Sequence, residues 1–257
     1  MILGVHCPVL RGYEAALGHA KALGVPLMQM LPYRRHHEPA EAELEEFRRE
    51  RTAAGIRLIA HSRFVPSLAS SDDRRRADSV RLLAEEIRLS EGLGAEAYIV
   101  HVAAYSPGAT PEEGLRLFAD SLARVKRSIP IWLENVPGGG RRLGGTLEEL
   151  ASLGQHVDGY CLDTAHAWAA GYDLSTAEAA WKFVGKAHRL LGGRVKAWHL
   201  NDSRAALGSH REHHASWGDG FLGTEGLKRL LEEDALGILE TPHGEDAKNL
   251  ALVRGLL

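Results

Sequence analysis

The sequence predicts an α/β protein, a (β/α)8 TIM barrel that forms a single domain over residues 1–257. Eight short apolar runs alternate with longer amphipathic segments, and no linker, repeat or low-complexity segment divides them. The 257 residues, 44% of them hydrophobic, are enough for one large core. A doubly wound open sheet is the structural alternative, but no glycine-rich phosphate fingerprint follows the first run.

The eight apolar runs have the pattern of parallel strands. They lack polar alternation, as expected for strands that are covered on both faces. The expected strands are residues 2–6, 26–30, 57–61, 97–101, 130–135, 159–164, 195–201 and 237–241.

The segments between these runs have the pattern of helices. Pro39 followed by acidic residues, with Gly55 beyond, matches the start and stop signals of a helix. Pro111 with Glu112 and Glu113 is typical of a first helical turn. The expected helices are residues 11–23, 39–54, 73–92, 111–127, 146–153, 175–191, 224–234 and 245–256. Eight strand–helix units in one chain favour the closed barrel.

Composition excludes several classes of protein. No apolar run approaches the ~18 residues of a membrane span, and the first residues have no basic segment followed by an apolar one. The two cysteines, Cys7 and Cys161, make no disulfide framework, so we expect a cytoplasmic protein without a membrane partner. The formal net charge of −3 argues against nucleic-acid binding, unless bound metals supply a local positive field.

Ionisable residues follow the predicted strands with unusual regularity. In such barrels the active site lies at the C-terminal ends of the strands. Those ends carry His6, His61, His101, Glu134 with Asn135, Asp163 with His166 three residues on, His199 and Glu240. Burying so many ionisable groups at one mouth is costly without partners, and metal ions would pair the carboxylates and accept imidazole lone pairs. A metal site is therefore predicted.

The stretch WHLNDSRAALGSHREHHASWGDG, residues 198–220, adds a second source of ligands. Glu212 and His214 form an E-x-H pair soon after the strand-ending His199. We expect Asp202 to support the ligands rather than bind metal, and His213, one residue out of phase with the pair, to be solvated. With His6 left out, nine candidate ligands remain, which is more than one four- or five-coordinate ion needs.

At this point the sequence resembles endonuclease IV, the metal-dependent apurinic/apyrimidinic DNA endonucleases with a (β/α)8 barrel and a trinuclear zinc site. The resemblance covers nearly the whole chain. Its specific segments are GYCLDTAHAWAAGYDL (159–174) and residues 198–220, and LENVPGGG (133–140) and LETP (239–242) follow the same order.

The resemblance implies a ligand set for three ions. His61 and His101 match the first ion's histidines, and Glu134 matches the glutamate that bridges to the second. The second ion's other ligands are Asp163, His199 and Glu240, and the third ion's set is His166, Glu212 and His214. The family often has aspartate where Glu212 stands. Two to three divalent ions are expected: Zn²⁺ by resemblance, although Mn²⁺ or Fe²⁺ also suit these ligands.

The implied activity is base-excision DNA repair. The expected hydrolase cuts the phosphodiester 5′ to an abasic site in double-stranded DNA, with Glu134 as the catalytic residue that orients or deprotonates the attacking water. Arg34, Arg35 and Phe64 are the candidate DNA contacts, and we expect a monomer. The chain departs from the family at Phe64, where a tyrosine-containing stretch is usual, and after His101, where proline and glycine are usual.

A sugar isomerase or epimerase of the xylose-isomerase-like barrels is the alternative function. One divalent metal on Glu134, Asp163, His199 and Glu240 would suit that chemistry equally well. A one-metal sugar enzyme has no need of His61, His101 or the Glu212–His214 pair, so the nuclease is favoured. A non-catalytic, metal-dependent DNA-binding protein is a third reading that no residue pattern supports.

Overall fold

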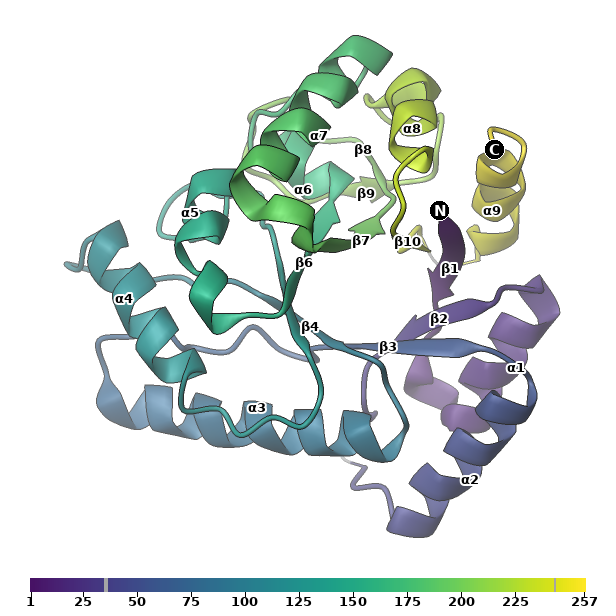
Figure 1. Ribbon diagram of the computed structural model, residues 1–257, viewed down its shortest axis with the longest axis horizontal. Helices are drawn as coiled ribbons and strands as arrows, with labels where there is room; N and C mark the ends of the chain where they lie inside the picture. The colour runs from purple at the N-terminus through teal and green to yellow at the C-terminus, as the bar shows by residue number, and fades with distance from the viewer. Residues whose placement is uncertain (35–36, 243) are drawn as a thin grey trace.

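Eight parallel strands close into one barrel, which confirms the predicted fold (Figure 1). The computed structural model describes residues 1–34, 37–242 and 244–257. The strand order around the barrel is β1-β10-β7-β6-β5-β4-β3-β2. The strands are β1 Ile2–His6, β2 Leu27–Met30, β3 Arg57–His61, β4 Tyr98–His101, β5 Ile131–Glu134, β6 Gly159–Asp163, β7 Val195–His199 and β10 Leu236–Leu239.

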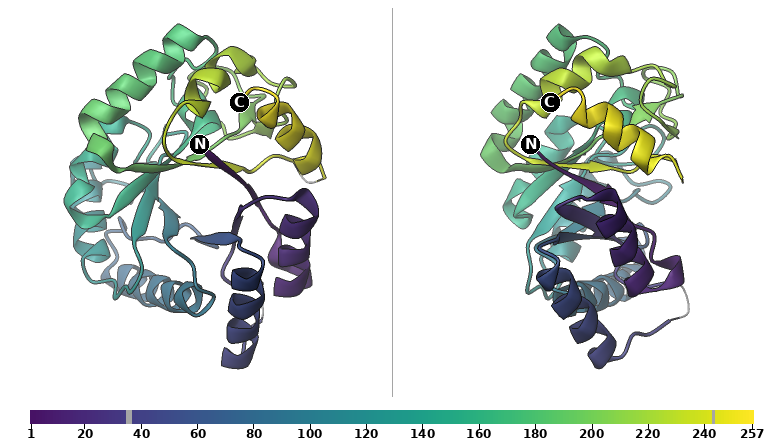
Figure 2. Two further views of the ribbon diagram at one scale, coloured as in Figure 1. Left: turned by 45° about the vertical axis from the view of Figure 1, so that its right-hand side comes forward. Right: turned by 90° about the vertical axis from the view of Figure 1, so that its right-hand side faces the viewer.

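Helices surround the barrel on its outside (Figures 1 and 2). They are α1 Tyr13–Leu23, α2 Glu41–Ala53, α3 Asp73–Gly92, α4 Pro111–Leu122, α5 Leu147–Ser152, α7 Ala177–Leu191, α8 Gly223–Leu231 and α9 Asp246–Arg254, with 3₁₀ turns η1 Val9–Arg11, η2 Gly154–His156 and η3 Gly192–Arg194. Local sequence sets their starts: Thr110 caps α4 ahead of Pro111, and Thr146 forms a capping box with Glu149 at α5.

One predicted helix, residues 111–127, is shorter than expected. α4 ends at Leu122, and the chain continues in tighter turns in which Arg124 N–H donates to Ser121 O and Val125 N–H donates to Leu122 O. Such i→i−3 bonds commonly close the last turn of a helix. Pro130 lies directly ahead of β5 and gives no support to a longer helix.

Two short elements at the C-terminal ends of the strands were not predicted. The helix α6, Thr164–Ala169, starts directly after β6, and its N-cap Asp163 accepts the backbone N–H of His166. The strands β8, Asp202–Ser203, and β9, His214–Ala215, pair antiparallel and fold residues 198–220 back on themselves. Asp202 holds this fold together, because its carboxylate accepts the backbone N–H groups of residues 203, 218, 220 and 222.

The inside of the barrel is filled by apolar side chains. They are Leu27, Ile59, Ala97, Ile99, Cys161, Ala197, Leu236 and Ile238. Cys7 and Cys161 are both buried and free, and burial raises the pKa of each thiol to about 12. Both cysteines therefore pack in the core, as the sequence predicted. Apolar side chains fill the barrel beneath its polar rim.

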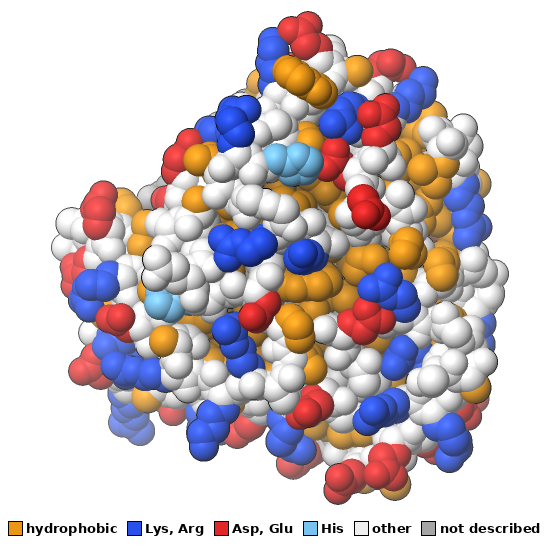
Figure 3. Space-filling model, in the orientation of Figure 1, with side chains coloured by type: hydrophobic (Ala, Val, Ile, Leu, Met, Phe, Trp, Pro, Cys, Tyr) orange, Lys and Arg blue, Asp and Glu red, His pale blue; other side chains and the backbone are white. Residues whose placement is uncertain are grey.

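Surface charge is mixed on the face of the molecule drawn in Figure 3. Lysine and arginine side chains alternate there with aspartate and glutamate, so that face presents no broad field of one sign. Among the described helices, none is long and apolar enough to cross a bilayer.

Candidate metal centre

The strand ends bring the predicted ligands to one rim of the barrel. His61, His101, Glu134, Asp163 and His199 are the last residues of β3, β4, β5, β6 and β7, and Glu240 directly follows β10. The strand register places predicted ligands of adjacent strands side by side: His101 pairs with Glu134, and Asp163 pairs with His199. All of these strands are parallel, so their polar ends converge.

Potential ligand atoms gather into four overlapping groups, each with its atoms within 4.8 Å of one another. The groups are His61–His101–Glu134, Glu134–Asp163–His199–Glu240, Asp163–His166–His214 and His61–His199–Glu240. Glu134 belongs to the first and second groups, and Asp163 belongs to the second and third. The two carboxylates therefore connect three adjacent places where a cation could bind.

Glu134 faces two groups with different oxygen atoms. Its Oε2 lies 2.8 Å from His61 Nε2 and 2.9 Å from His101 Nε2. Its Oε1 lies 2.9 Å from His199 Nδ1 on the other side. The side chain is fully buried. A carboxylate with one oxygen toward each of two sites has the geometry of a bridging ligand.

The third group lies where β6, α6 and β9 meet. His214 Nε2 is 3.4 Å from Asp163 Oδ2, and His166 Nε2 is 3.7 Å from Glu212 Oε2. Glu212 is the most exposed of the predicted ligands, with 57% of its side chain accessible. Glu212 is a member of none of the four groups and approaches His166 from the solvent side, whereas Asp163 belongs to the third group itself.

Three imidazole nitrogens at the rim are buried and make no hydrogen bond among the described residues: His101 Nε2, His166 Nε2 and His214 Nε2. The His101 nitrogen is close to Glu134 but not aligned for a hydrogen bond. Leaving a buried polar atom without a partner costs about 1–3 kcal/mol. His101 belongs to the first group, beside Glu134, and His166 and His214 belong to the third, beside Asp163. Imidazole with carboxylate is a ligand set that zinc accepts, so both places fit a divalent cation.

Backbone carbonyls fix the other ring nitrogen of three of the rim histidines. His61 Nδ1–H donates to Ser62 O at 2.9 Å, His166 Nδ1–H donates to Asn135 O at 2.9 Å, and His214 Nδ1–H donates to Glu240 O at 3.3 Å. In each ring the Nε2 lone pair is thereby left for the centre. Metal-binding histidines commonly have such a hydrogen bond on the nitrogen that faces away from the ion.

The charged residues of the rim shift one another's pKa values. Burial alone would raise the pKa of Glu134, but the positive charges of His101 and His199 outweigh it and hold that pKa well below its usual value. Burial likewise opposes protonation of His166, yet the nearby negative charges of Asp163 and Glu134 raise its pKa well above normal. The nearby His166 imidazole lowers the pKa of Glu212 to about 2, although burial opposes it. The lowered pKa values of Glu134 and Glu212 favour the ionised carboxylates, which are the forms that bind a cation.

Three amides support the rim; Asn135 was noted at a strand end without a role, and Asn201 and Gln29 were not singled out in the sequence. Asn201 Nδ2 donates to Asp163 Oδ2 at 2.6 Å, and its Oδ1 accepts the backbone N–H of Glu240 at 3.0 Å. Asn135 exchanges two hydrogen bonds with the backbone of Asp163. Gln29 is fully buried in β2 and reaches His199 and Glu240. A lone polar residue within the apolar run PLMQM is the signal that could have found Gln29.

Other predicted residues lie apart from the ligand groups. His6 is in none of them, Asp202 binds backbone N–H groups, and His213 is exposed. Of the candidate DNA contacts, Arg34 is exposed and Phe64 is half-buried in the segment after His61. Arg35, the third candidate DNA contact, lies outside the described residues.

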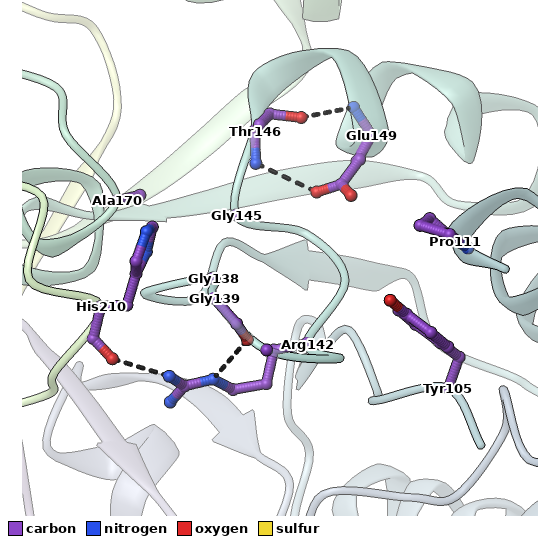
Figure 4. Close-up of a pocket in the computed structure, with 11 residues that line it drawn as sticks. Tyr105, Pro111, Gly138, Gly139, Arg142, Gly145, Thr146, Glu149, Ala170 and His210 are labelled. Carbon is purple, nitrogen blue, oxygen red and sulfur yellow. Dashed lines mark hydrogen bonds between the residues drawn. The ribbon is translucent and has the colours of Figure 1, made fainter. Parts of the chain in front are cut away.

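A cavity of about 220 Å³ lies between the loop after β5 and the loop after β7 (Figure 4). Arg142 joins the two loops, because its Nη2 donates to His210 O at 2.6 Å and its Nε donates to Gly139 O at 3.4 Å. Gly139 has φ +77°, and a Cβ there would lie 2.6 Å from His210 Cβ. The loops thus pack closely just before Glu212 and His214.

Known proteins resemble this chain along its whole length. Residues 17–254 match the family described as xylose isomerase-like TIM barrel. A probable endonuclease 4 of Solibacter usitatus is 35% identical, over 100% of this chain and 97% of the relative. The crystal structure of endonuclease IV from Thermus thermophilus matches with a TM-score of 0.86 and 34% identity, over 100% of this chain and 98% of the other. A D-tagatose 3-epimerase-like protein matches with a TM-score of 0.81 at 21% identity, over 100% and 97%, which shows the shared fold alone.

Proposed function

The chain belongs to the endonuclease IV family of xylose isomerase-like TIM barrels, and we propose that it is a metal-dependent apurinic/apyrimidinic endodeoxyribonuclease. It hydrolyses the phosphodiester 5′ to an abasic site in double-stranded DNA, as a step of base-excision repair. The observation that carries the proposal is the set of three contiguous ligand groups joined by Glu134 and Asp163.

The ligand groups distinguish this function from the sugar isomerase or epimerase. The group of Glu134, Asp163, His199 and Glu240 alone would hold the single ion of a sugar enzyme. His61 and His101 on one side, and His166 and His214 on the other, would then stand at the rim without an ion to bind. The full-length relatives at about one-third identity also carry endonuclease names, whereas the epimerase-like match lies below that level.

The proposed site holds up to three divalent ions, with Zn²⁺ as the preferred metal. His61, His101 and Glu134 would hold the first, Glu134, Asp163, His199 and Glu240 the second, and His166, Glu212 and His214 the third. Bound ions supply Lewis acidity toward the phosphate and lower the pKa of water. The buried Glu134 carboxylate lies between the first two groups, where it can orient the attacking water and take its proton.

DNA would approach from the loops around the rim. Arg34 is exposed, Val65 is 56% exposed and Phe64 is half-buried, so the segment after His61 can reach a duplex. We include Arg34, Arg35 and Phe64 as DNA contacts in the proposal. All ligands come from one chain, so the proposed enzyme is complete as a monomer.

A nicking assay with a Glu134→Gln variant tests the function. Gln keeps the shape of Glu134 but removes its charge and its ability to take a proton, so cleavage of an abasic-site duplex should fall by more than about 100-fold. Glu232→Gln, at the exposed end of α8, is the matched control and should cleave like the wild type. EDTA should abolish cleavage in both active proteins. An absence of nicking by the wild type with every divalent metal would exclude the assignment.

A further inference from the structure

The side-chain amide of Gln29 makes contacts with three rim residues at once. Its Nε2 donates to Glu240 Oε1 at 2.5 Å and lies 3.1 Å from His6 Nδ1, and its Oε1 lies 2.8 Å from His199 Nε2. Gln29 is fully buried. An ionised carboxylate can only accept hydrogen bonds, so the amide nitrogen must face Glu240 and the amide oxygen must face His199.

This orientation decides which nitrogen of His199 can bind a cation. The amide oxygen of Gln29 accepts a hydrogen bond, so the proton of the neutral imidazole is on Nε2. The lone pair is then on Nδ1, which lies 2.9 Å from Glu134 Oε1 and 3.3 Å from Glu240 Oε2. Nδ1 is therefore the nitrogen that faces the carboxylates of the second ligand group.

The same amide also sets the tautomer of His6, here through its nitrogen rather than its oxygen. One N–H of Gln29 goes to Glu240 and the second goes to His6 Nδ1, which must accept it. The proton of the neutral His6 ring is then on Nε2. His6 belongs to no ligand group, and no side-chain hydrogen bond of its Nε2 occurs within the described part of the chain.

His6 is also placed to meet a bound molecule. With Glu240 it lines a cavity of about 640 Å³ beside the centre, and 27% of its side chain is accessible. The cavity wall that His6 shares with Glu240 also carries Pro8 and Arg11. A DNA strand that crosses the rim could pass along this wall. A donor at this wall can bind an oxygen of that strand without binding metal.

We propose that Gln29 is a positioning residue with two roles. It holds His199 with Nδ1 toward the second ion, and it holds His6 with Nε2–H toward an oxygen atom of the bound DNA strand. His6 is thus a substrate-binding residue rather than a ligand. The role of His6 rests on the proposed function, whereas the role of Gln29 toward the ion does not.

Zinc affinity of the metal-free protein tests the first role without DNA. Gln29→Met keeps the volume of the side chain but removes its hydrogen bonds, and should weaken zinc binding by about 10- to 100-fold in competition with a chelator. Gln155→Met, at an exposed position in η2, is the matched control. If Gln29→Met does not fold, Gln29→Asn, too short to reach all three partners, should weaken binding in the same direction. Affinity equal to that of the control would overturn the role.

Kinetics on an abasic-site duplex tests the second role. His6→Ala should leave the number of bound zinc ions unchanged and raise KM about 10-fold with little change in kcat, because a donor to the substrate is lost. His6→Gln, which keeps an N–H donor, should restore part of the loss. In a Gln29→Met background, His6→Ala should add little. An unchanged KM, or the loss of an ion, would overturn the role of His6; failure of all nicking would instead count against the proposed function.

Discussion

At the scale of single residues, two carboxylates determine what the rim can bind. Glu134 presents one oxygen to His61 and His101 and the other to His199, and Asp163 is shared by the second and third groups. Each of these two side chains therefore belongs to two neighbouring groups, and each can serve two places where a cation could bind. The sequence predicted both residues as ligands because they end neighbouring strands. Their bridging geometry depends on strand register.

The buried carboxylate of Glu86, in α3, lies outside the ligand groups and should make stability depend on pH. Its Oε2 accepts hydrogen bonds from Tyr98 and from the backbone N–H of Arg63, whereas its Oε1 has no partner among the described residues. Burial raises the pKa of Glu86 above its ordinary value of 4.5, despite the hydrogen bonds that lower it. The folded protein therefore binds this proton more tightly than the unfolded chain does.

The sign of the effect follows from that difference. As pH rises from 4.5 through the higher folded pKa, the unfolded chain loses the proton first, so the free energy of unfolding should fall. Glu86→Gln should remove this fall. Urea unfolding of both metal-free proteins from pH 4.5 upward checks it, with each sample measured in EDTA. A stability difference between the two proteins that does not change with pH would show that Glu86 has an ordinary pKa.

At the scale of elements, the loop that carries Glu212 and His214 is held by contacts with its neighbours. The β8–β9 hairpin closes it at one end, and Arg142 ties its middle to the loop after β5 through His210 (Figure 4). Trp168 Nε1–H in α6 donates to Ala205 O at 2.8 Å and adds a third tie. The third ligand group is therefore positioned by contacts between loops.

Loss of the Arg142 hydrogen bonds should selectively weaken binding of the third ion. Arg142→Ala removes the hydrogen bonds to His210 O and Gly139 O, so we expect the weakest-bound zinc ion to lose about 10-fold in affinity. Arg142 is exposed, so stability should change by less than about 0.5 kcal/mol. Arg141→Ala, its exposed neighbour, is the control. Equal zinc affinity in the two variants, measured by chelator competition, would show that the tie does not position the loop.

The regular elements could be predicted from the sequence, and the short ones could not. The apolar runs are strong signals because each strand is buried on both faces, and start signals such as Pro111 mark the helices. The helix α6 and the β8–β9 hairpin have too few residues for a hydrophobic period. Both form because buried carboxylates, Asp163 and Asp202, bind their backbone N–H groups. Such contacts exist only after distant segments meet.

The candidate site, too, could be predicted from the sequence only in part. Its ligands were found because histidine or carboxylate at successive strand ends is rare and costly. The amides that support them were given no role. The roles of Asn135 and Asn201 are recognisable only from the atoms they contact, and the lone polar residue in the apolar run PLMQM was not used as a signal for Gln29. Glu212 was singled out by its E-x-H spacing and placed with the third ion by resemblance, and its exposed approach to His166 could not be predicted from that spacing.

At the scale of the whole molecule, the barrel keeps its apolar core and its ionisable residues in different regions. Apolar side chains fill the interior, while the ionisable residues stand on the rim above them. A closed ring of parallel strands fixes the positions of all the strand ends at once. Loops between the strand ends can therefore vary in sequence while the ligands keep their positions.

The number of metal ions per chain tests the central claim most directly, which is that the rim is a multinuclear centre. Native mass spectrometry of zinc-loaded protein, with elemental analysis of the same sample, measures it. Two to three ions per chain are expected, and Glu212→Gln combined with His214→Ala should remove one of them while the barrel stays folded. A single ion in the fully loaded wild type would contradict the account and favour the one-metal sugar enzyme.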